Sequence, residues 1–91
     1  MYNKKYRVEK IEQFGRYNSI YEDMEGCVAY IAYLNVGDRG WFLYEQDDWF
    51  NTPHRIHTST VNNIEYTDDL VIVTTNNTKL TFKLIKENND E

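Results

Sequence analysis

The stretch "LVIVTTNNTKLTFKL", residues 70–84, decides the fold. Two runs rich in β-branched and apolar residues flank Asn76-Asn77, and asparagine tolerates the positive φ of a tight two-residue turn. The sequence therefore predicts a β-hairpin over these residues, with one apolar face and one mixed face. The pairs expected on the apolar face are Val71–Phe82 and Val73–Leu80, continued by Leu84, and those on the mixed face are Ile72–Thr81 and Thr74–Lys79.

A second turn at Asp68-Asp69 extends the same pattern upstream. If these two aspartates form the turn, Tyr66 lies opposite Val71 and Ile64 lies opposite Val73, so the apolar face of the hairpin continues onto a third strand. Two independent turns thus give one coherent apolar face. The sequence predicts a three-stranded meander at the C-terminal end.

The N-terminal half is less regular. In "KYRVEKIEQF", residues 5–14, Tyr6 and Val8 have one parity and Ile11 the other, which predicts a strand with a bulge. Residues 27–35 are rich in strand-forming residues and predict a strand. A one-turn helix over residues 20–25 is the alternative for this part of the chain.

The segment "GDRGWFLYEQDDWF", residues 37–50, combines aromatic and acidic residues. Its "WFLYE" portion predicts a short strand, with Trp41 and Leu43 facing the core. The opposite parity, Phe42 and Tyr44, is expected to be half-buried. Trp49 and Phe50 follow two aspartates and precede Asn51-Thr52-Pro53, so they lie in a loop, where they either cover the barrel end or contact a partner.

Five or six short strands with little helix predict a mainly β domain, or an α+β one if the short helix forms. The expected architecture is a small barrel or a bent antiparallel sheet that ends in the meander. "LNVGDRGWFL", residues 34–43, resembles the glycine-aspartate turn and following strand of small SH3-like barrels. We expect one domain over residues 1–86 and a frayed polar tail over residues 87–91.

Composition limits the classes of partner. The 91 residues carry a net charge of −5, with a pI of about 4.9. Such a chain is not expected to bind nucleic acid or an anionic membrane directly, because phosphate contacts need a basic surface. It is suited to docking on a basic protein. No signal peptide or membrane span is apparent, so we expect the cytoplasm of a host cell.

Catalytic and metal-binding sets are not apparent in the sequence. Cys27 with His54 or His57 is the only thiol–imidazole pair, and a lone cysteine in an apolar run is usually a small buried hydrophobe. The two histidines are three positions apart, so on a strand they point to opposite faces. We therefore expect no enzyme activity, no metal and no cofactor.

The acidic residues offer a sharper hypothesis than solubility alone, although solubility explains much surface charge. Acidic and aromatic residues share one loop, and further acids lie near another turn; aromatic residues are typical anchors of protein interfaces. The candidate partner-binding residues are Tyr44, Asp47, Asp48, Trp49, Phe50, Glu65, Asp68 and Asp69.

The run from residue 54 to residue 84 resembles small proteins carried by phages and mobile elements of low-GC Gram-positive bacteria. It carries a Thr58-Ser59-x-Val61 step before a Thr75-x-Asn77-Thr78 hairpin. The resemblance implies a non-enzymatic inhibitor of host defence, of the anti-CRISPR type. Such an inhibitor occupies a basic nucleic-acid groove on a CRISPR effector or other nuclease, as a DNA mimic, and competes with DNA.

Two alternatives stay open. An SH3-like adaptor would bind a peptide or a subunit through an exposed aromatic groove. A sponge for a small nucleotide would need a pocket with converging arginine and lysine side chains, which two chains of a homodimer could supply together. The chain is expected to be a monomer or a homodimer.

Overall fold

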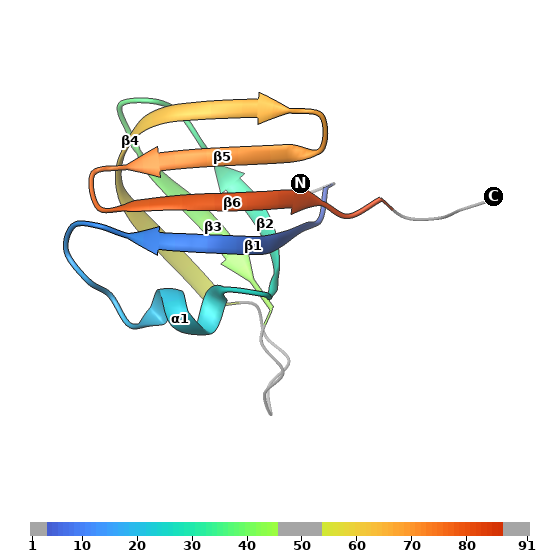
Figure 1. Ribbon diagram of the computed structural model, residues 1–91, viewed down its shortest axis with the longest axis horizontal. Helices are drawn as coiled ribbons and strands as arrows, with labels where there is room; N and C mark the ends of the chain where they lie inside the picture. The colour runs from blue at the N-terminus through green and yellow to red at the C-terminus, as the bar shows by residue number, and fades with distance from the viewer. Residues whose placement is uncertain (1–3, 46–53, 87–91) are drawn as a thin grey trace.

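The computed structural model describes residues 4–45 and 54–86. Within them, six antiparallel strands run in chain order around a closed barrel, and β1 closes the ring by pairing with both β2 and β6 (Figure 1). The elements are β1 (Tyr6–Gln13), α1 (Ile20–Met24), β2 (Val28–Tyr33), β3 (Arg39–Tyr44), β4 (His54–Thr67), β5 (Leu70–Thr75) and β6 (Thr78–Leu84). The predicted mainly β fold is confirmed. The strand and the helix that we weighed as alternatives over residues 20–35 both form, one after the other.

The C-terminal meander forms in the predicted register. Val71 pairs with Phe82 and Val73 with Leu80, and all four side chains are buried. On the other side of β5, Ile64 pairs with Val73 and Tyr66 with Val71, also as predicted. Tyr66 has the expected partner but is 70% exposed, although its partner Val71 is buried in the core.

The chemistry of the β5–β6 turn differs from the prediction. Among the described non-glycine residues, Asp68 alone has a positive φ, of 47°, so Asn76 and Asn77 do not adopt the left-handed conformation. The turn is held instead by the buried Thr75 hydroxyl oxygen, which accepts hydrogen bonds from the backbone N–H groups of Asn77 (3.2 Å) and Thr78 (3.0 Å). Local side-chain bonding of this kind favours a turn without positive φ.

The predicted bulge in β1 is confirmed. The register against β6 shifts between Val8 and Lys10, which lets Val8 be fully buried while Ile11 packs on the same core. The chain around α1 satisfies the backbone groups of this irregular strand. Gly26 donates its N–H to the Val8 carbonyl (2.7 Å), and Ile11 donates its N–H to the Glu25 carboxylate (2.8 Å).

The predicted orientation of β3 is wrong. Phe42 and Tyr44 are buried, at 0% and 2% exposure, whereas Trp41 is 40% exposed. Apolar residues occupy both parities of this strand, so alternation alone cannot choose between them. The interior has room for the Phe42 ring because Gly40, on the same parity, has no side chain: a Cβ there would lie 3.0 Å from that ring.

Aromatic rings and a short helix fill the barrel. The Phe42 and Phe82 rings stack with centroids 5.0 Å apart, and Tyr6 meets Phe82 edge-on at 6.2 Å. At one end, α1 places Tyr21 and Met24 in the core, with 5% and 0% exposure. A five-residue helix has little stability of its own. Its burial against the barrel therefore holds it in place.

The connection from β1 to α1 is fastened to the β5–β6 turn by one residue. The Asn77 carbonyl oxygen accepts hydrogen bonds from the N–H groups of Phe14 (3.0 Å) and Gly15 (3.1 Å). The Asn77 side-chain oxygen accepts a third from the N–H of Arg16 (3.0 Å). We call these three bonds the Asn77 clasp. They join segments that are about sixty residues apart in the chain, as the separation of 61 between Arg16 and Asn77 shows.

Gly15→Ala tests the clasp. A Cβ at this position would lie 2.2 Å from Oδ1 and 2.8 Å from Cα of Asn77, so the two segments must separate. We expect a loss of about 1–3 kcal/mol in the free energy of unfolding, the usual cost of overpacking. Urea denaturation measures it. The control is Ser19→Ala, because the Ser19 side chain forms no cap hydrogen bond, and its effect is expected to stay within about 0.5 kcal/mol. Equal stabilities of Gly15→Ala and the control would contradict the clasp.

Candidate functional site

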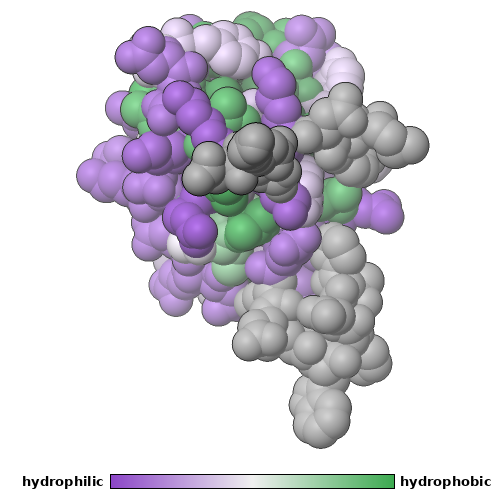
Figure 2. Space-filling view, turned by 90° about the vertical axis from the view of Figure 1, so that its right-hand side faces the viewer, coloured by the Kyte–Doolittle hydropathy of each residue, from purple (hydrophilic) through white to green (hydrophobic). Residues whose placement is uncertain are grey.

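The two predicted groups of acidic residues are attached to opposite ends of β4. Asp47, Asp48, Trp49 and Phe50 lie outside the described residues, in the segment between Glu45 and His54. Glu65, Asp68 and Asp69, which we call the turn acids, lie at the far end of the 14-residue β4 and in the turn that follows it. A strand of this length extends roughly 45 Å along its path. Figure 2 shows the side of the barrel on which the β4–β5 turn lies, where hydrophilic residues surround a smaller number of hydrophobic ones.

Tyr44 does not lie on the surface. Its ring is 2% exposed and stacks on His54 with centroids 5.3 Å apart, so the prediction that it is half-buried is wrong. Burial raises the pKa of its hydroxyl, and the Asp23 carboxylate and Cys27 raise that pKa further. Almost none of the Tyr44 surface is available for contact with a partner.

A group of acids that the sequence prediction left out gathers around α1. Glu22 and Asp23 form the first turn of the helix, and Glu25 ends it. Glu45 is adjacent, because its N–H donates to the Val28 carbonyl just beyond the helix. We call these four residues the acidic end; it lies where β3 finishes and α1 closes the barrel (Figure 1). The predicted residues Asp47 and Asp48 come shortly after Glu45 in the chain.

The surface carboxylates are not neutralised by neighbouring cations. Within residues 4–45 and 54–86, no carboxylate forms an ion pair with a lysine or arginine. Several accept hydrogen bonds from tyrosine hydroxyls instead: Tyr17 donates to Glu22, Tyr30 to Glu45 (2.7 Å) and Tyr33 to Asp38 (2.6 Å). These bonds orient the carboxylates and leave their full charge at the surface. They also raise the pKa of the Tyr17 and Tyr33 hydroxyls.

An exposed row of rings crosses the outer face of β2, β3 and β4. Tyr33 is 46% exposed and pairs with Trp41, and Trp41 stacks on His57 with centroids 4.0 Å apart. His54 instead stacks on the buried Tyr44, so the two histidines lie on opposite faces of β4, as predicted. The predicted role of Cys27 as a small hydrophobe agrees with its position. Its thiol is half-buried, with a pKa raised by burial and by Asp23, which disfavours the reactive thiolate.

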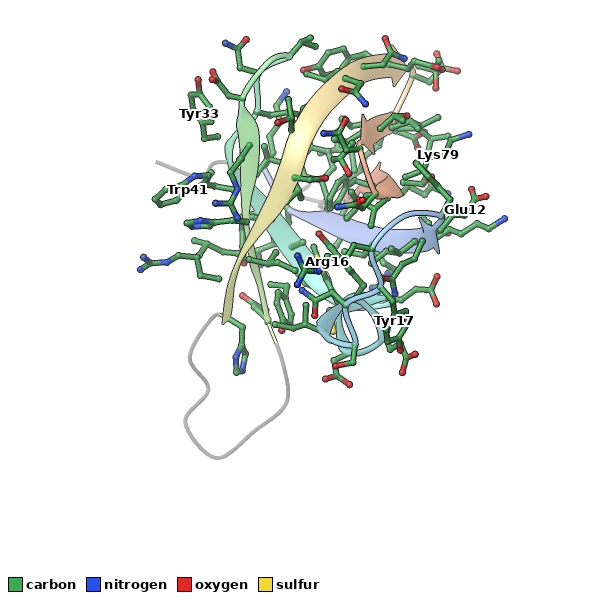
Figure 3. All side chains as sticks on the ribbon, turned by 90° about the vertical axis from the view of Figure 1, so that its left-hand side faces the viewer. Glu12, Arg16, Tyr17, Tyr33, Trp41 and Lys79 are labelled. Carbon is green, nitrogen blue, oxygen red and sulfur yellow. The ribbon has the colours of Figure 1, made fainter. Side chains whose placement is uncertain are left out.

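A polar cleft of about 380 Å³ opens beside β4. It is lined by residues 16–18 of the β1–α1 connection, Tyr21 of α1, Arg39 of β3, residues 57–60 of β4 and the Asn76-Asn77 turn. We call it the cationic cleft, because its charged lining residues are arginines. Figure 3 shows Arg16 between β4 and α1, with its side chain directed toward β4.

Sequence reasoning reached this cleft only in part. The sequence predicts that a nucleotide site needs converging arginine and lysine side chains, and the structure places two arginines, Arg16 and Arg39, in the cleft. No motif in the sequence marks Arg16 as a cleft residue, because only the Asn77 clasp brings its segment to the cleft. The quoted motifs Thr58-Ser59-x-Val61 and Thr75-x-Asn77-Thr78 were the available signal, since Thr58, Ser59 and Asn77 all line the cleft.

Comparisons with known proteins do not identify this chain. No family model, curated protein or solved structure matches it. In the described part of the chain, α1 is far too short to cross a membrane. The same residues contain no cluster of three or more metal-ligating histidine, cysteine, aspartate or glutamate side chains.

The tyrosines make stability sensitive to alkaline pH. The hydroxyl pKa values of Tyr6, Tyr17, Tyr21, Tyr33 and Tyr44 are all raised in the fold. The unfolded chain, with hydroxyl pKa values of about 10, therefore loses these protons first. The associated stability is complete below about pH 10 and is lost as the pH rises through the folded pKa values.

Tyr44→Phe is expected to reduce this alkaline loss, because it removes a buried titrating hydroxyl and keeps the ring. Urea unfolding at about pH 9 and about pH 11 measures the difference. A loss of the same size in the wild type and in the variant would show that Tyr44 does not contribute.

Proposed function

We propose that this protein is a non-enzymatic inhibitor, of the anti-CRISPR type, that blocks a basic nucleic-acid-binding surface of a host defence nuclease. The observation that supports this proposal best is the acidic end. Three of its carboxylates belong to α1 and its end, and the fourth, Glu45, follows β3 and accepts from Tyr30; none has a cationic partner among the described residues. Unpaired surface charge of one sign steers a protein toward a surface of the opposite sign and fixes its register there.

The acidic end suits this role better than the turn acids do. In the sequence, Asp47 and Asp48 come shortly after Glu45, so two further carboxylates lie close to the acidic end along the chain. The turn acids are attached to the other end of β4, and Lys83 is paired with Leu70 beside them. A groove that normally holds the phosphates of DNA carries many arginine and lysine side chains, and a concentrated set of carboxylates matches it.

An adaptor that binds through aromatic residues is the second candidate. The exposed row Tyr33, Trp41 and His57 supports it, because aromatic residues are enriched at interface hot spots. This row lies on the outer face of the sheet. Trp41→Ala is therefore expected to weaken binding if the protein is an adaptor and to leave binding unchanged if it is an inhibitor, when it is tested in the same assay.

The decisive experiment measures inhibition of DNA cleavage by a purified Cas9-type nuclease, together with binding at increasing salt. We expect the protein to compete with target DNA and to bind less tightly as salt rises. Glu22→Lys with Asp23→Lys is expected to weaken binding about tenfold or more and to flatten the salt dependence, because like charges then face each other. Asp47→Lys with Asp48→Lys should act in the same direction.

The matched control is Glu65→Lys with Asp69→Lys, which makes the same change in net charge at the other end of the molecule. If only the two pairs at the acidic end reduce binding, the proposal stands for that end. If only the control pair reduces binding, the predicted turn acids form the interface. No inhibition of the nuclease by the wild-type protein, or equal losses from all three pairs, would count against a specific acidic interface.

A further inference from the structure

We propose that the cationic cleft binds a small nucleotide, with its phosphate held by Arg16 and Arg39 and its base against Tyr17. This site adjoins the acidic end through the hydrogen bond from Tyr17 to Glu22, but the proposal does not depend on the inhibitor proposal. A volume of about 380 Å³ lies at the lower end of the usual range for small-molecule pockets, about 300–1,000 Å³. The cleft therefore suits a small ligand rather than a protein surface.

The charge of the cleft is opposite to that of the protein. Arg16 and Arg39 line it, and its described lining includes no aspartate or glutamate, although the chain as a whole has a net charge of −5. A bound anion would therefore meet two positive charges and no carboxylate of the described lining. Guanidinium groups match the geometry of phosphate oxygens, with two parallel hydrogen bonds each.

Both arginines are held in place and keep donors available. The Arg39 Nε–H donates to the Thr58 carbonyl (2.8 Å), which orients the guanidinium, and no described residue accepts from its terminal nitrogens. The Asn77 clasp fixes the backbone of Arg16, while its guanidinium forms no hydrogen bond within the described chain. The Arg39 guanidinium is thus a pre-oriented donor, which lowers the entropic cost of binding, whereas the exposed Arg16 side chain is positioned only through its backbone.

Neutral groups in the cleft add further donors. The side-chain oxygen of Asn77 accepts a hydrogen bond from the backbone N–H of Arg16, and that of Asn18 accepts one from the backbone N–H of Ile20 (3.1 Å). The amide nitrogens of both side chains therefore remain as donors. The Ser59 hydroxyl is buried and has no hydrogen-bond partner among the described residues. Buried polar groups are nearly always hydrogen-bonded, so we count this hydroxyl as a candidate donor to a ligand.

The aromatic wall favours a nucleotide over a simple anion. Tyr17 is 59% exposed at the cleft, and its hydroxyl donates to Glu22, which limits rotation of the ring. His57 of β4 also lines the cleft. An exposed, oriented ring beside a phosphate site is the arrangement on which a base stacks.

The test is titration of the full chain with AMP, GMP, adenosine and inorganic phosphate, followed by calorimetry and amide chemical shifts. We expect AMP or GMP to bind and to shift residues 16–18, 57–60 and 76–77. Inorganic phosphate should shift the same residues but bind more weakly, and adenosine should not bind. The nucleotide proposal is overturned if neither nucleotide binds at millimolar concentration. It is equally overturned if adenosine or inorganic phosphate binds as tightly as the nucleotides.

Two variants tie binding to the cleft. Arg16→Ala is expected to weaken AMP binding about tenfold or more, because it removes a charged hydrogen-bond donor. Arg55→Ala, the same loss of charge on an exposed residue of β4 outside the cleft, should change it less than about twofold. Equal effects of the two variants would overturn the site.

Ser59→Ala supplies a readout that a structural role would not give. It removes a hydroxyl without a described partner, so we expect the melting temperature to be unchanged or higher and AMP binding to be weaker by about threefold or more. A lower melting temperature with unchanged AMP affinity would assign Ser59 to the fold instead of the cleft.

Discussion

The Asn77 clasp is the constraint on which the rest of the molecule depends. The barrel itself is a meander in which each strand pairs with the next, but the β1–α1 connection has no strand to pair with. Three backbone N–H groups of that connection are satisfied by the carbonyl and side-chain oxygens of Asn77. Because the clasp fixes the path of this segment, α1 can close the barrel and Arg16 can face β4. One turn residue therefore links the core, the acidic end and the cationic cleft.

The sequence was sufficient for those parts of the fold in which local pattern and turn position agree. The meander over residues 64–84 has alternating apolar residues between two-residue turns, and its register could be derived from that alone. The β1 bulge could be predicted for the same reason, from the change of parity between Val8 and Ile11. β3 could not be oriented, because Trp41 and Phe42 are both large and apolar; Gly40 and the bulge opposite it, at Thr58 and Ser59, decide the matter.

The candidate sites also divide into features that the sequence could predict and features that only the fold brings together. Acidic residues are visible in any sequence, and Glu22, Asp23 and Glu25 could have been grouped with Glu45 only once β3 was known to end beside α1. Most of the cleft was out of reach, because its lining comes from four separate stretches of the chain that no periodicity connects. Asn77 is an example. The sequence predicted a positive φ in a tight turn for it, whereas in the structure its oxygens accept hydrogen bonds from the β1–α1 connection.

The closure of the barrel has a consequence for synthesis of the chain on the ribosome. In the described structure β1 pairs with β2 over Tyr6 and Arg7 but with β6 along Tyr6–Gln13. β1 therefore stays largely unpaired until β6 has left the exit tunnel. During that time its free edge can pair with a strand of another nascent chain. Charged residues lie along this strand, as the lysines, arginine and glutamates of "KKYRVEKIE" show. Charge on an unpaired strand edge is a known protection against aggregation.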